Sequence, residues 1–419
     1  MWKVERNRSI SSTFRSKYHP LRLYRNLSEA VVENLHQIFV ENRYADKVIE
    51  KVLKKNPKWG ARDRRFIAET TYDIVRWYRL FTELTNAPEG DYWTLFGAWC
   101  MWNKVDLPDW EEFRKLDKPK FYERYDKAKH KLRVSESIPD WLDEVGASEL
   151  GAGWEEEIHA LNEPAKVVLR VNTQKISRQE LQRVLIEEEG IETESLSEFP
   201  DALILSERQN IFTRQQFKDG LFEVQDAGSQ LISAFLQAKP GMRVIDACAG
   251  GGGKTLHLAA LMQNKGRIIA LDTEEWKLDE LKKRARRAGA SDIIEARVID
   301  SSKVIKRLEK SADRLLLDVP CSGLGVLKRN PDAKWKLSLD FIEEVKSKQQ
   351  EILGTYPSML KPGGIMVYAT CSILPSENEK QVKQFMQSNE GKFELLEQRT
   401  LLPSAGFDGF YMARVRKVG

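Results

Sequence analysis

The sequence predicts an α/β protein: a doubly wound parallel sheet in the carboxyl-terminal part, preceded by an all-helical domain and a small α+β segment. Helix-spaced apolar residues up to about residue 150, short strand-like runs after them, and strictly alternating strands and helices from Gly241 onward predict this organisation. A chain of 419 residues is long enough for two to three domains. We expect domains over residues 1–155, 156–235 and 236–419.

The first expected domain shows helical periodicity with almost no alternation typical of strands. Apolar residues follow one helical face over 30–39 and again over 66–75. Tryptophans and tyrosines are dense here, and in a small helical domain such side chains usually belong to the core. The helical pattern ends at the glycine-rich break 151–153.

The second expected domain mixes strands with a helix. Short apolar runs at 167–172, 202–205 and 221–224 predict strands, and residues 178–189 predict a helix. This pattern indicates a small α+β segment.

The third expected domain contains short apolar runs at 243–246, 267–272, 296–300, 314–318 and 365–371. The first four end in aspartates and the last ends in Cys371; the aspartates are Asp246, Asp272, Asp300 and Asp318. Because parallel strands present their carboxyl ends at one edge, where ligands bind, we expect these side chains to converge on one site.

The turn after the first of these strands is rich in glycine and reads Cys248-Ala-Gly-Gly-Gly-Gly-Lys254. It lacks one glycine of a P-loop and one of a dinucleotide fingerprint. Its backbone N–H groups suit a carboxylate or an adenosyl group as well as a phosphate. Asp272, at the next strand end, can accept hydrogen bonds from both ribose hydroxyls. An adenosine ligand without a phosphate cradle suggests S-adenosylmethionine.

The four cysteines are far apart and form no Cys-x-x-Cys pair, so the sequence predicts neither a disulfide framework nor a metal site. Cys321 and Cys371, however, each come just past a strand end. Cations after Cys321 would favour thiolates at this edge.

Pyrimidine chemistry gives such thiols a purpose. A thiolate added to carbon-6 of cytosine makes carbon-5 nucleophilic enough to take a methyl group. Asp318 is placed to hydrogen-bond or protonate ring nitrogen 3. The residues alone do not decide which cysteine is the nucleophile.

The carboxyl-terminal part resembles the Sun/Fmu (RsmB-like) family of S-adenosylmethionine-dependent RNA cytosine-C5 methyltransferases, with their Rossmann-like sheet. The resemblance covers roughly residues 165–416 and rests on these segments: 225–229, 248–254, Asp272, Asp300, 318–323, 329–335, 370–372 and 408–410. It implies that Cys371 attacks carbon-6, that Cys321 assists release and that Asp318 lies between the methyl donor and the base. It also implies a set of cofactor-binding residues: Cys248, Ala249, Gly250, Gly251, Gly252, Gly253, Lys254, Asp272, Asp300 and Asp318.

The helical domain resembles the NusB-like module of the ribosomal-RNA members of this family, through segments 62–66 and 72–76. This resemblance favours small-subunit (16S) ribosomal RNA over transfer RNA as the substrate. It further implies that Arg170 and Asn172 help to hold RNA, and Arg329 and Lys334 are additional candidate RNA contacts.

The net charge of only +4 does not fit a purely electrostatic nucleic-acid binder, although residues 1–26 form a basic segment that could act as an arm. No run resembles a membrane span or a signal peptide, so we expect a cytoplasmic protein, and nothing demands more than a monomer.

Three other hypotheses stay open at this stage. A transfer-RNA cytosine methyltransferase would share the chemistry. An adenine or guanine amine methyltransferase would need an aromatic residue in place of the thiol after Asp318. A catalytically silent ribosome-assembly protein would need neither the cysteines nor the aspartates at the strand ends.

Overall fold

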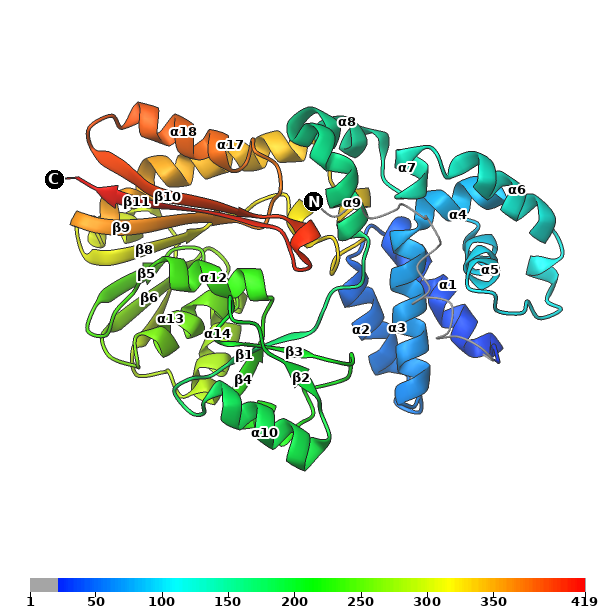
Figure 1. Cartoon of the computed structure of the whole chain (residues 1–419), viewed down its shortest axis with the longest axis horizontal. Coiled ribbons are helices and arrows are strands. Elements are labelled where there is room, and N and C mark those ends of the chain that lie inside the picture. Colours follow the sequence, from blue (N-terminus) through cyan, green and yellow to red (C-terminus); the bar gives the residue numbers. More distant parts are fainter. Residues whose placement is uncertain (1–21, 419) are drawn as a thin grey trace. The chain divides into compact units, whose positions relative to one another are not determined.

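The computed structural model describes residues 22–418, which fall into two compact units (Figure 1). One unit ends at Ala147 and also includes Asn330–Lys336; the other comprises Ser148–Arg329 and the chain from Leu337 onward. Most of the basic segment expected in residues 1–26 lies outside the described residues. Within the described part, no helix is both long enough and apolar enough to cross a membrane.

The first unit is helical, as predicted, and its described residues contain no strand. Its helices are α1 (Arg25–Phe39), α2 (Ala45–Lys55), α3 (Ala61–Arg76), α4 (Tyr78–Thr85), α5 (Tyr92–Trp102), α6 (Lys118–Ala128), α7 (Leu132–Ser135) and α16 (Ala333–Lys336), with a 3₁₀ turn at Glu111–Phe113. Helix α8 (Asp140–Leu150) contains the boundary between the units.

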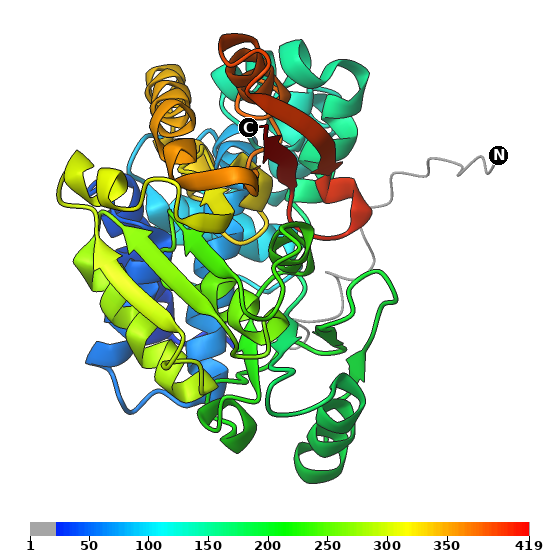
Figure 2. The ribbon, with the colours of Figure 1, turned by 90° about the vertical axis from the view of Figure 1, so that its left-hand side faces the viewer.

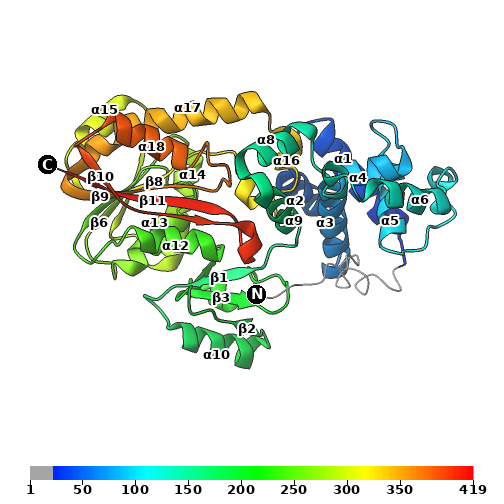
Figure 3. The same cartoon turned by 45° about the horizontal axis from the view of Figure 1, so that its top comes forward.

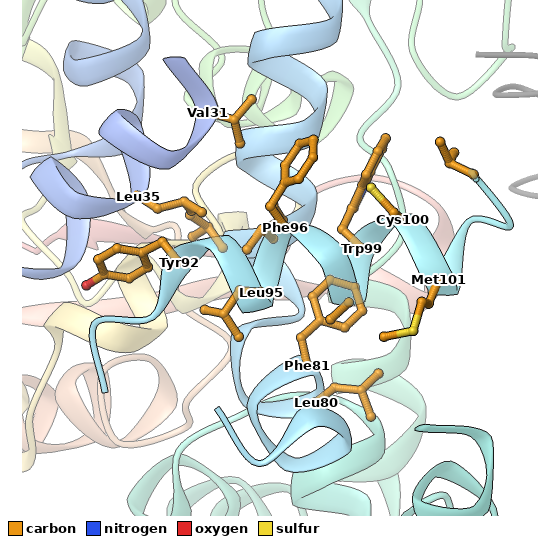
Figure 4. Packing of buried hydrophobic residues seen from close by; sticks show 14 of the residues in the cluster. Val31, Leu35, Leu80, Phe81, Tyr92, Leu95, Phe96, Trp99, Cys100 and Met101 are labelled. Atoms are coloured by element: carbon orange, nitrogen blue, oxygen red, sulfur yellow. The ribbon is translucent and has the colours of Figure 1, made fainter. Parts of the chain in front are cut away.

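Helix α5 forms the centre of this unit and is apolar on all sides, as expected of a helix that is surrounded by others. Its Asp91 cap accepts a hydrogen bond from the Thr94 amide (3.1 Å), which fixes where the helix begins. Phe96 and Trp99 stack with ring centroids 5.9 Å apart and pack against α1 and α4 (Figure 4). Of the aromatic residues predicted to be core, Trp99 is fully buried, and the other tryptophans are partly buried and pack against the same cluster.

The segment Asn330–Lys336 belongs to the helical unit although its neighbours in the chain do not. The Asp332 carboxylate accepts from the amide of Ala45, at the start of α2 (3.0 Å). At the end of α3, Trp335 Nε1 donates to the carbonyl of Val75 (2.7 Å) and Lys334 Nζ to that of Arg76 (2.9 Å). Helix ends leave such backbone groups without partners, and this segment satisfies them.

The second unit begins with a small antiparallel sheet in the strand order β2-β3-β1-β4. It consists of β1 (Val168–Val171), β2 (Thr193–Glu194), β3 (Ala202–Leu205) and β4 (Phe222–Val224), accompanied by α9 (Trp154–Leu161), α10 (Arg178–Glu189) and α11 (Gln215–Lys218). Helix α10 has the predicted bounds, because Ser177 caps its first turn and Gly190 ends it in the left-handed region.

The main sheet has seven strands in the order β10-β11-β9-β8-β5-β6-β7 (Figure 2). Its parallel strands are β5 (Arg243–Asp246), β6 (Arg267–Asp272), β7 (Ile294–Val298), β8 (Ala312–Asp318) and β9 (Leu360–Thr370); β10 (Phe393–Leu401) and β11 (Phe410–Lys417) add an antiparallel edge. The predicted doubly wound sheet is confirmed. The chain order reverses beside β5, which is where ligands bind in such sheets.

Helices cover both faces of this sheet (Figure 3). Val244 on β5 faces the core beneath one set of helices, and its neighbour Ile245 faces the core beneath the other set, as strand alternation requires. The first set is α12 (Ala227–Phe235), α13 (Gly253–Leu261) and α14 (Glu275–Ala288); the second is α15 (Ser302–Arg307), α17 (Leu339–Thr355) and α18 (Glu379–Ser388). Short 3₁₀ turns lie at Gly151–Gly153, Leu324–Val326, Tyr356–Met359 and Pro403–Ala405.

One predicted strand is displaced. Strand β7 ends at Val298, not at Asp300, so the Asp300 side chain is exposed two residues beyond the strand. The strands that end at Asp246, Asp272 and Asp318 lie where the sequence predicts them.

Candidate active site at the carboxyl edge of the main sheet

The glycine-rich turn joins β5 to α13 and depends on glycine at two positions. Gly250 and Gly252 have φ values of +52° and +85°, a region that other residues rarely occupy. A Cβ on Gly252 would lie 2.6 Å from Leu281 Cγ, whereas a Cβ on Gly250 would meet nothing within 4 Å. The turn therefore packs closely against α14 at Gly252 and is open at Gly250.

Asp272, at the end of β6, is tied to this turn. Its Oδ2 accepts from the amide of Gly250 (2.9 Å), and its Oδ1 accepts from the amide of Glu274 (2.9 Å). Each carboxylate oxygen keeps a further lone pair. Asp272 thus combines a fixed orientation with the capacity to accept two more hydrogen bonds.

Two arginines donate hydrogen bonds to the backbone of the glycine-rich turn. Arg284 donates to the carbonyl of Gly251 (2.8 Å) and pairs with Glu223 (3.0 Å), while Arg170 donates to the carbonyl of Gly253 and to Gln225. Arg170 is only 3% exposed, and burial lowers its pKa to about 10. Arg170, which the family resemblance assigns to RNA, thus contacts the backbone of the glycine-rich turn in this structure.

The other predicted RNA contacts are also engaged internally. Asn172 is buried and donates to the carbonyls of Gly220 and Ala288, both at 2.9 Å. Lys334 is 1% exposed within the helical unit, where burial lowers its pKa well below the usual range. These placements give no support to phosphate contacts by either side chain. Arg329 pairs with Asp226 (2.8 Å) and Asp408 (2.5 Å) but stays partly exposed.

Lys254 and Asp318 form an ion pair at the centre of this edge, with Nζ 2.6 Å from Oδ2. Burial alone would lower the pKa of Lys254, but the charge and hydrogen bond of Asp318, together with neighbouring acidic groups, outweigh burial and raise that pKa. Beside them Asp246 is 1% exposed, accepts from Thr255 Oγ1 (2.7 Å), and has its pKa raised to about 7 by burial. The lysine thus offsets the negative charge gathered at the strand ends.

The two cysteines predicted to act together lie side by side. Cys321 Sγ and Cys371 Sγ are 3.0 Å apart, and the amide of Cys371 donates to Cys321 Sγ (3.2 Å). Their strands are neighbours, with Asp318 of β8 opposite Ala369 of β9. The hydrogen bond to Cys371 and burial together raise the pKa of the Cys321 thiol well above its usual range. Either sulfur can be the donor in the contact between the two thiols.

The remaining predicted cofactor residues lie around the same edge. Burial raises the pKa of Cys248, which is therefore a protonated thiol within the glycine-rich turn. Ala249 is buried, and its amide donates to the carbonyl of Leu271 (2.9 Å). Asp300 accepts from its neighbour Ser301 (2.9 Å).

Three residues at this edge were not predicted from the sequence. Ser322 and Ser372 each follow one of the two cysteines, and both donate a hydroxyl hydrogen bond to the carboxylate of Glu377 (2.5 Å each). Ser322 and Glu377 are 55 positions apart, so no local pattern connects them. The only sequence signal is the serine that follows each cysteine.

No set of three or more histidine, cysteine, aspartate or glutamate side chains within residues 22–418 is arranged to hold a metal ion.

Comparisons with known proteins agree with this geometry. Residues 233–416 match the model of the family described as 16S rRNA methyltransferase RsmB/F, and residues 138–212 match the ferredoxin-like domain of RsmF/B-like methyltransferases. A Synechocystis protein named "Probable ribosomal RNA small subunit methyltransferase B" is 32% identical over 393 residues, covering 85% of this chain and 88% of that protein.

The ribosomal RNA small subunit methyltransferase B of Pasteurella multocida is 36% identical over 294 residues, covering 67% of this chain and 65% of that protein. Among solved structures, the crystallised protein PH0851 superimposes with a TM-score of 0.80 at 27% identity, covering 95% of this chain and 100% of that one. The chain belongs to the RsmB/F family of 16S rRNA methyltransferases.

Proposed function

We propose that this protein methylates carbon-5 of a cytidine in small-subunit ribosomal RNA, with S-adenosylmethionine as the methyl donor and Cys371 as a transient covalent nucleophile. The observation that carries the proposal is the pair of thiols 3.0 Å apart at the sheet edge, beside the Lys254–Asp318 ion pair. The relatives are named as methyltransferases of small-subunit ribosomal RNA, which supports the choice of substrate.

The residues at the edge fit an adenosyl ligand. Asp272 has free lone pairs for the two ribose hydroxyls, and the open space at Gly250 lets a ligand approach the backbone. No phosphate cradle is needed for such a ligand. When bound, S-adenosylmethionine supplies an electrophilic methyl group.

Cys371 performs the covalent step in this proposal. Its thiolate forms a sulfur–carbon bond to carbon-6 of the base, and the displaced ring electrons make carbon-5 nucleophilic. After carbon-5 takes the methyl group, a water molecule accepts the carbon-5 proton, and the sulfur–carbon bond breaks to return the thiolate. Cys321 lies beside Cys371 as a thiol in this proposal, since the hydrogen bond to Cys371 and burial raise the pKa of Cys321 well above its usual range.

Asp318 and Cys321 assist this chemistry. Asp318 lies two residues before Pro320 at the end of β8 and pairs with Lys254. In its protonated form the Asp318 carboxyl can donate a hydrogen bond to ring nitrogen 3 as negative charge develops there. Cys321 promotes the release that follows loss of the carbon-5 proton. In this proposal Asp300 faces the adenine ring of S-adenosylmethionine, as the family resemblance implies.

RNA recognition in this proposal involves the partly exposed Arg329 and the helical unit, for which an RNA-binding NusB-like role stays a prediction. The target cytidine must be unstacked to reach the sheet edge, which favours a single-stranded loop. We place the activity in the cytoplasm and expect the protein to act as a monomer.

Bisulfite mapping tests this function. RNA from a strain that lacks the protein is incubated with purified enzyme and S-adenosylmethionine, both as deproteinised RNA and as ribosomal particles. One newly protected cytosine in small-subunit ribosomal RNA is expected. Protection in transfer RNA instead would retain the chemistry and overturn the substrate, and no protection in either preparation would favour a silent assembly protein.

A further inference from the structure

We propose that Glu377 is a positioning residue that sets the geometry of Cys321 and Cys371 by holding the two turns that carry them. This inference rests on the proposed function, because it concerns the thiols that the proposed reaction uses. Glu377 itself does not touch the base or the methyl donor in this account.

The Glu377 carboxylate lies between the two cysteine turns. One oxygen accepts from the hydroxyls of Ser322 and Ser372, both at 2.5 Å, and the other accepts from the Ser322 amide (2.8 Å). Each serine directly follows one of the cysteines. One side chain therefore holds the backbone beside both thiols.

Further contacts anchor Glu377 to the rest of the fold. Its backbone carbonyl accepts from the Tyr368 hydroxyl on β9 (2.7 Å). Gln349 on α17 donates to both the Glu377 carboxylate (3.2 Å) and the carbonyl of Pro320, the residue before Cys321 (3.0 Å). Glu377 is thus anchored to the sheet through Tyr368 and to α17 through Gln349.

A carboxylate suits this position because Ser322, Ser372 and Gln349 all donate hydrogen bonds to it. Glu377 is 0% exposed, and a buried charge is costly unless hydrogen bonds compensate it. A carboxylate only accepts, whereas an amide at the same place would direct N–H groups at other donors. Replacing Glu377 by glutamine therefore keeps the volume and disturbs the hydrogen bonds.

Small displacements matter at such a site, because the productive approach of a nucleophile tolerates little misplacement. We expect Glu377→Gln to lower kcat by at least about tenfold, with KM for RNA and the dissociation constant for S-adenosylmethionine changed less than about twofold. Glu377→Asp, which keeps the charge but shortens the reach, should recover part of the rate.

A matched control lies elsewhere in the same unit. Glu157 on α9 is also buried and also accepts from a serine amide and hydroxyl, those of Ser404 (3.0 and 2.7 Å). If loss of a buried carboxylate acts only through stability, Glu157→Gln and Glu377→Gln should behave alike. Positioning predicts that only Glu377→Gln lowers kcat.

A second readout reports the thiol geometry without turnover. The thiol oxidant diamide should join Cys321 and Cys371 rapidly in the unmodified protein and at least about fivefold more slowly in Glu377→Gln, as followed by peptide mapping. The control Glu157→Gln should match the unmodified protein. If kcat and the rate of cross-linking were the same in all three proteins, the inference would be overturned.

Two further variants cover the case in which Glu377→Gln does not fold. Ser322→Ala and Ser372→Ala each remove one hydroxyl donor to Glu377 and should each lower kcat with unchanged KM; unmodified kcat in both would overturn the inference. The unmodified protein and Cys321→Ala serve as functional references. If neither yields methylated RNA or a covalent adduct, the proposed function fails, and this outcome differs from a failure of the Glu377 variants alone.

Discussion

The thiols of Cys321 and Cys371 lie 3.0 Å apart, although 50 positions separate them in the chain. Neighbouring parallel strands, β8 and β9, bring them together by ending at the same edge. The hydrogen bond to Cys371 and burial raise the pKa of the Cys321 thiol well above its usual range. The fold therefore places side by side two cysteines that no local sequence pattern connects.

Asp246 should make the stability of the second unit depend on pH. Burial raises its pKa from 3.8 to about 7 in the folded protein. Between these values the folded state keeps a proton that the unfolded state has lost, so the free energy of unfolding falls as pH rises through this window, by an order of magnitude of about 4 kcal/mol. Asp246→Asn should remove most of this fall, measured by hydrogen exchange of the β5 amides.

Asp313 provides a control of opposite sign for this prediction. Burial would raise its pKa, but hydrogen bonds from Lys361 and the Arg243 amide outweigh burial and lower it. Asp313 thus contributes stability that is present above its unfolded pKa and lost as pH falls through its folded pKa. If Asp246→Asn left the slope between pH 4 and pH 7 unchanged, the raised pKa of Asp246 would be wrong.

Arg170 should matter for the methyl donor more than for RNA. Replacing it by methionine removes the donor to the Gly253 carbonyl at the start of α13 and leaves buried acceptors without that partner. We expect the dissociation constant for S-adenosylmethionine to rise about tenfold while RNA affinity stays within about twofold, measured by calorimetry and filter binding.

The exposed Arg183 serves as the control for Arg170, because it pairs only with Glu180 and Glu187 on its own helix. Arg183→Met should change neither affinity. If Arg170→Met bound RNA more weakly but bound S-adenosylmethionine as tightly as the unmodified protein, this prediction would be wrong. Arg170 would then have the RNA-binding role that the family resemblance implies.

Trp335 should stabilise the helical unit even though the chain on both sides of Asn330–Lys336 belongs to the other unit. Trp335→Ala removes its contact with Tyr78 (centroids 5.4 Å apart) and the hydrogen bond to Val75, which should cost about 2–4 kcal/mol of unfolding free energy. Trp335→Phe keeps most of the packing and should cost about 1 kcal/mol. Urea unfolding followed by far-UV circular dichroism checks both values, and equal costs would contradict the packing role.

The sequence predicted the parallel strands of the main sheet, because these are short apolar runs that end in a polar residue, but it did not predict the antiparallel strands β10 and β11. Asp246, Asp272 and Asp318 end their strands as expected. Strand β7 is the exception: it begins and ends two residues earlier than the run 296–300, because Ile294 already pairs with Ile268 of β6. Strand pairing, which is a tertiary property, overrode the local pattern there.

The hydrogen-bond partners of the predicted RNA contacts could not be predicted from the sequence. A lysine or arginine next to a catalytic motif carries no local sign of its partner. The partner of Lys334 is a backbone carbonyl 258 positions away, and Arg170 reaches the carbonyl of Gly253 across 83 positions. Glu377 was missed for the same reason, since its serine partner Ser322 is distant in the chain.

The central claim is that Cys371 bonds to the target base while Cys321 promotes release. The most direct measurement incubates Cys321→Ala with substrate RNA and S-adenosylmethionine, isolates the slow-migrating species on a denaturing gel, and identifies the modified peptide by mass spectrometry after nuclease digestion. The account predicts a methylated cytidine attached to Cys371, and no adduct or methyl transfer in Cys371→Ala. A nucleotide attached to another residue, or methyl transfer retained by Cys371→Ala, would contradict it.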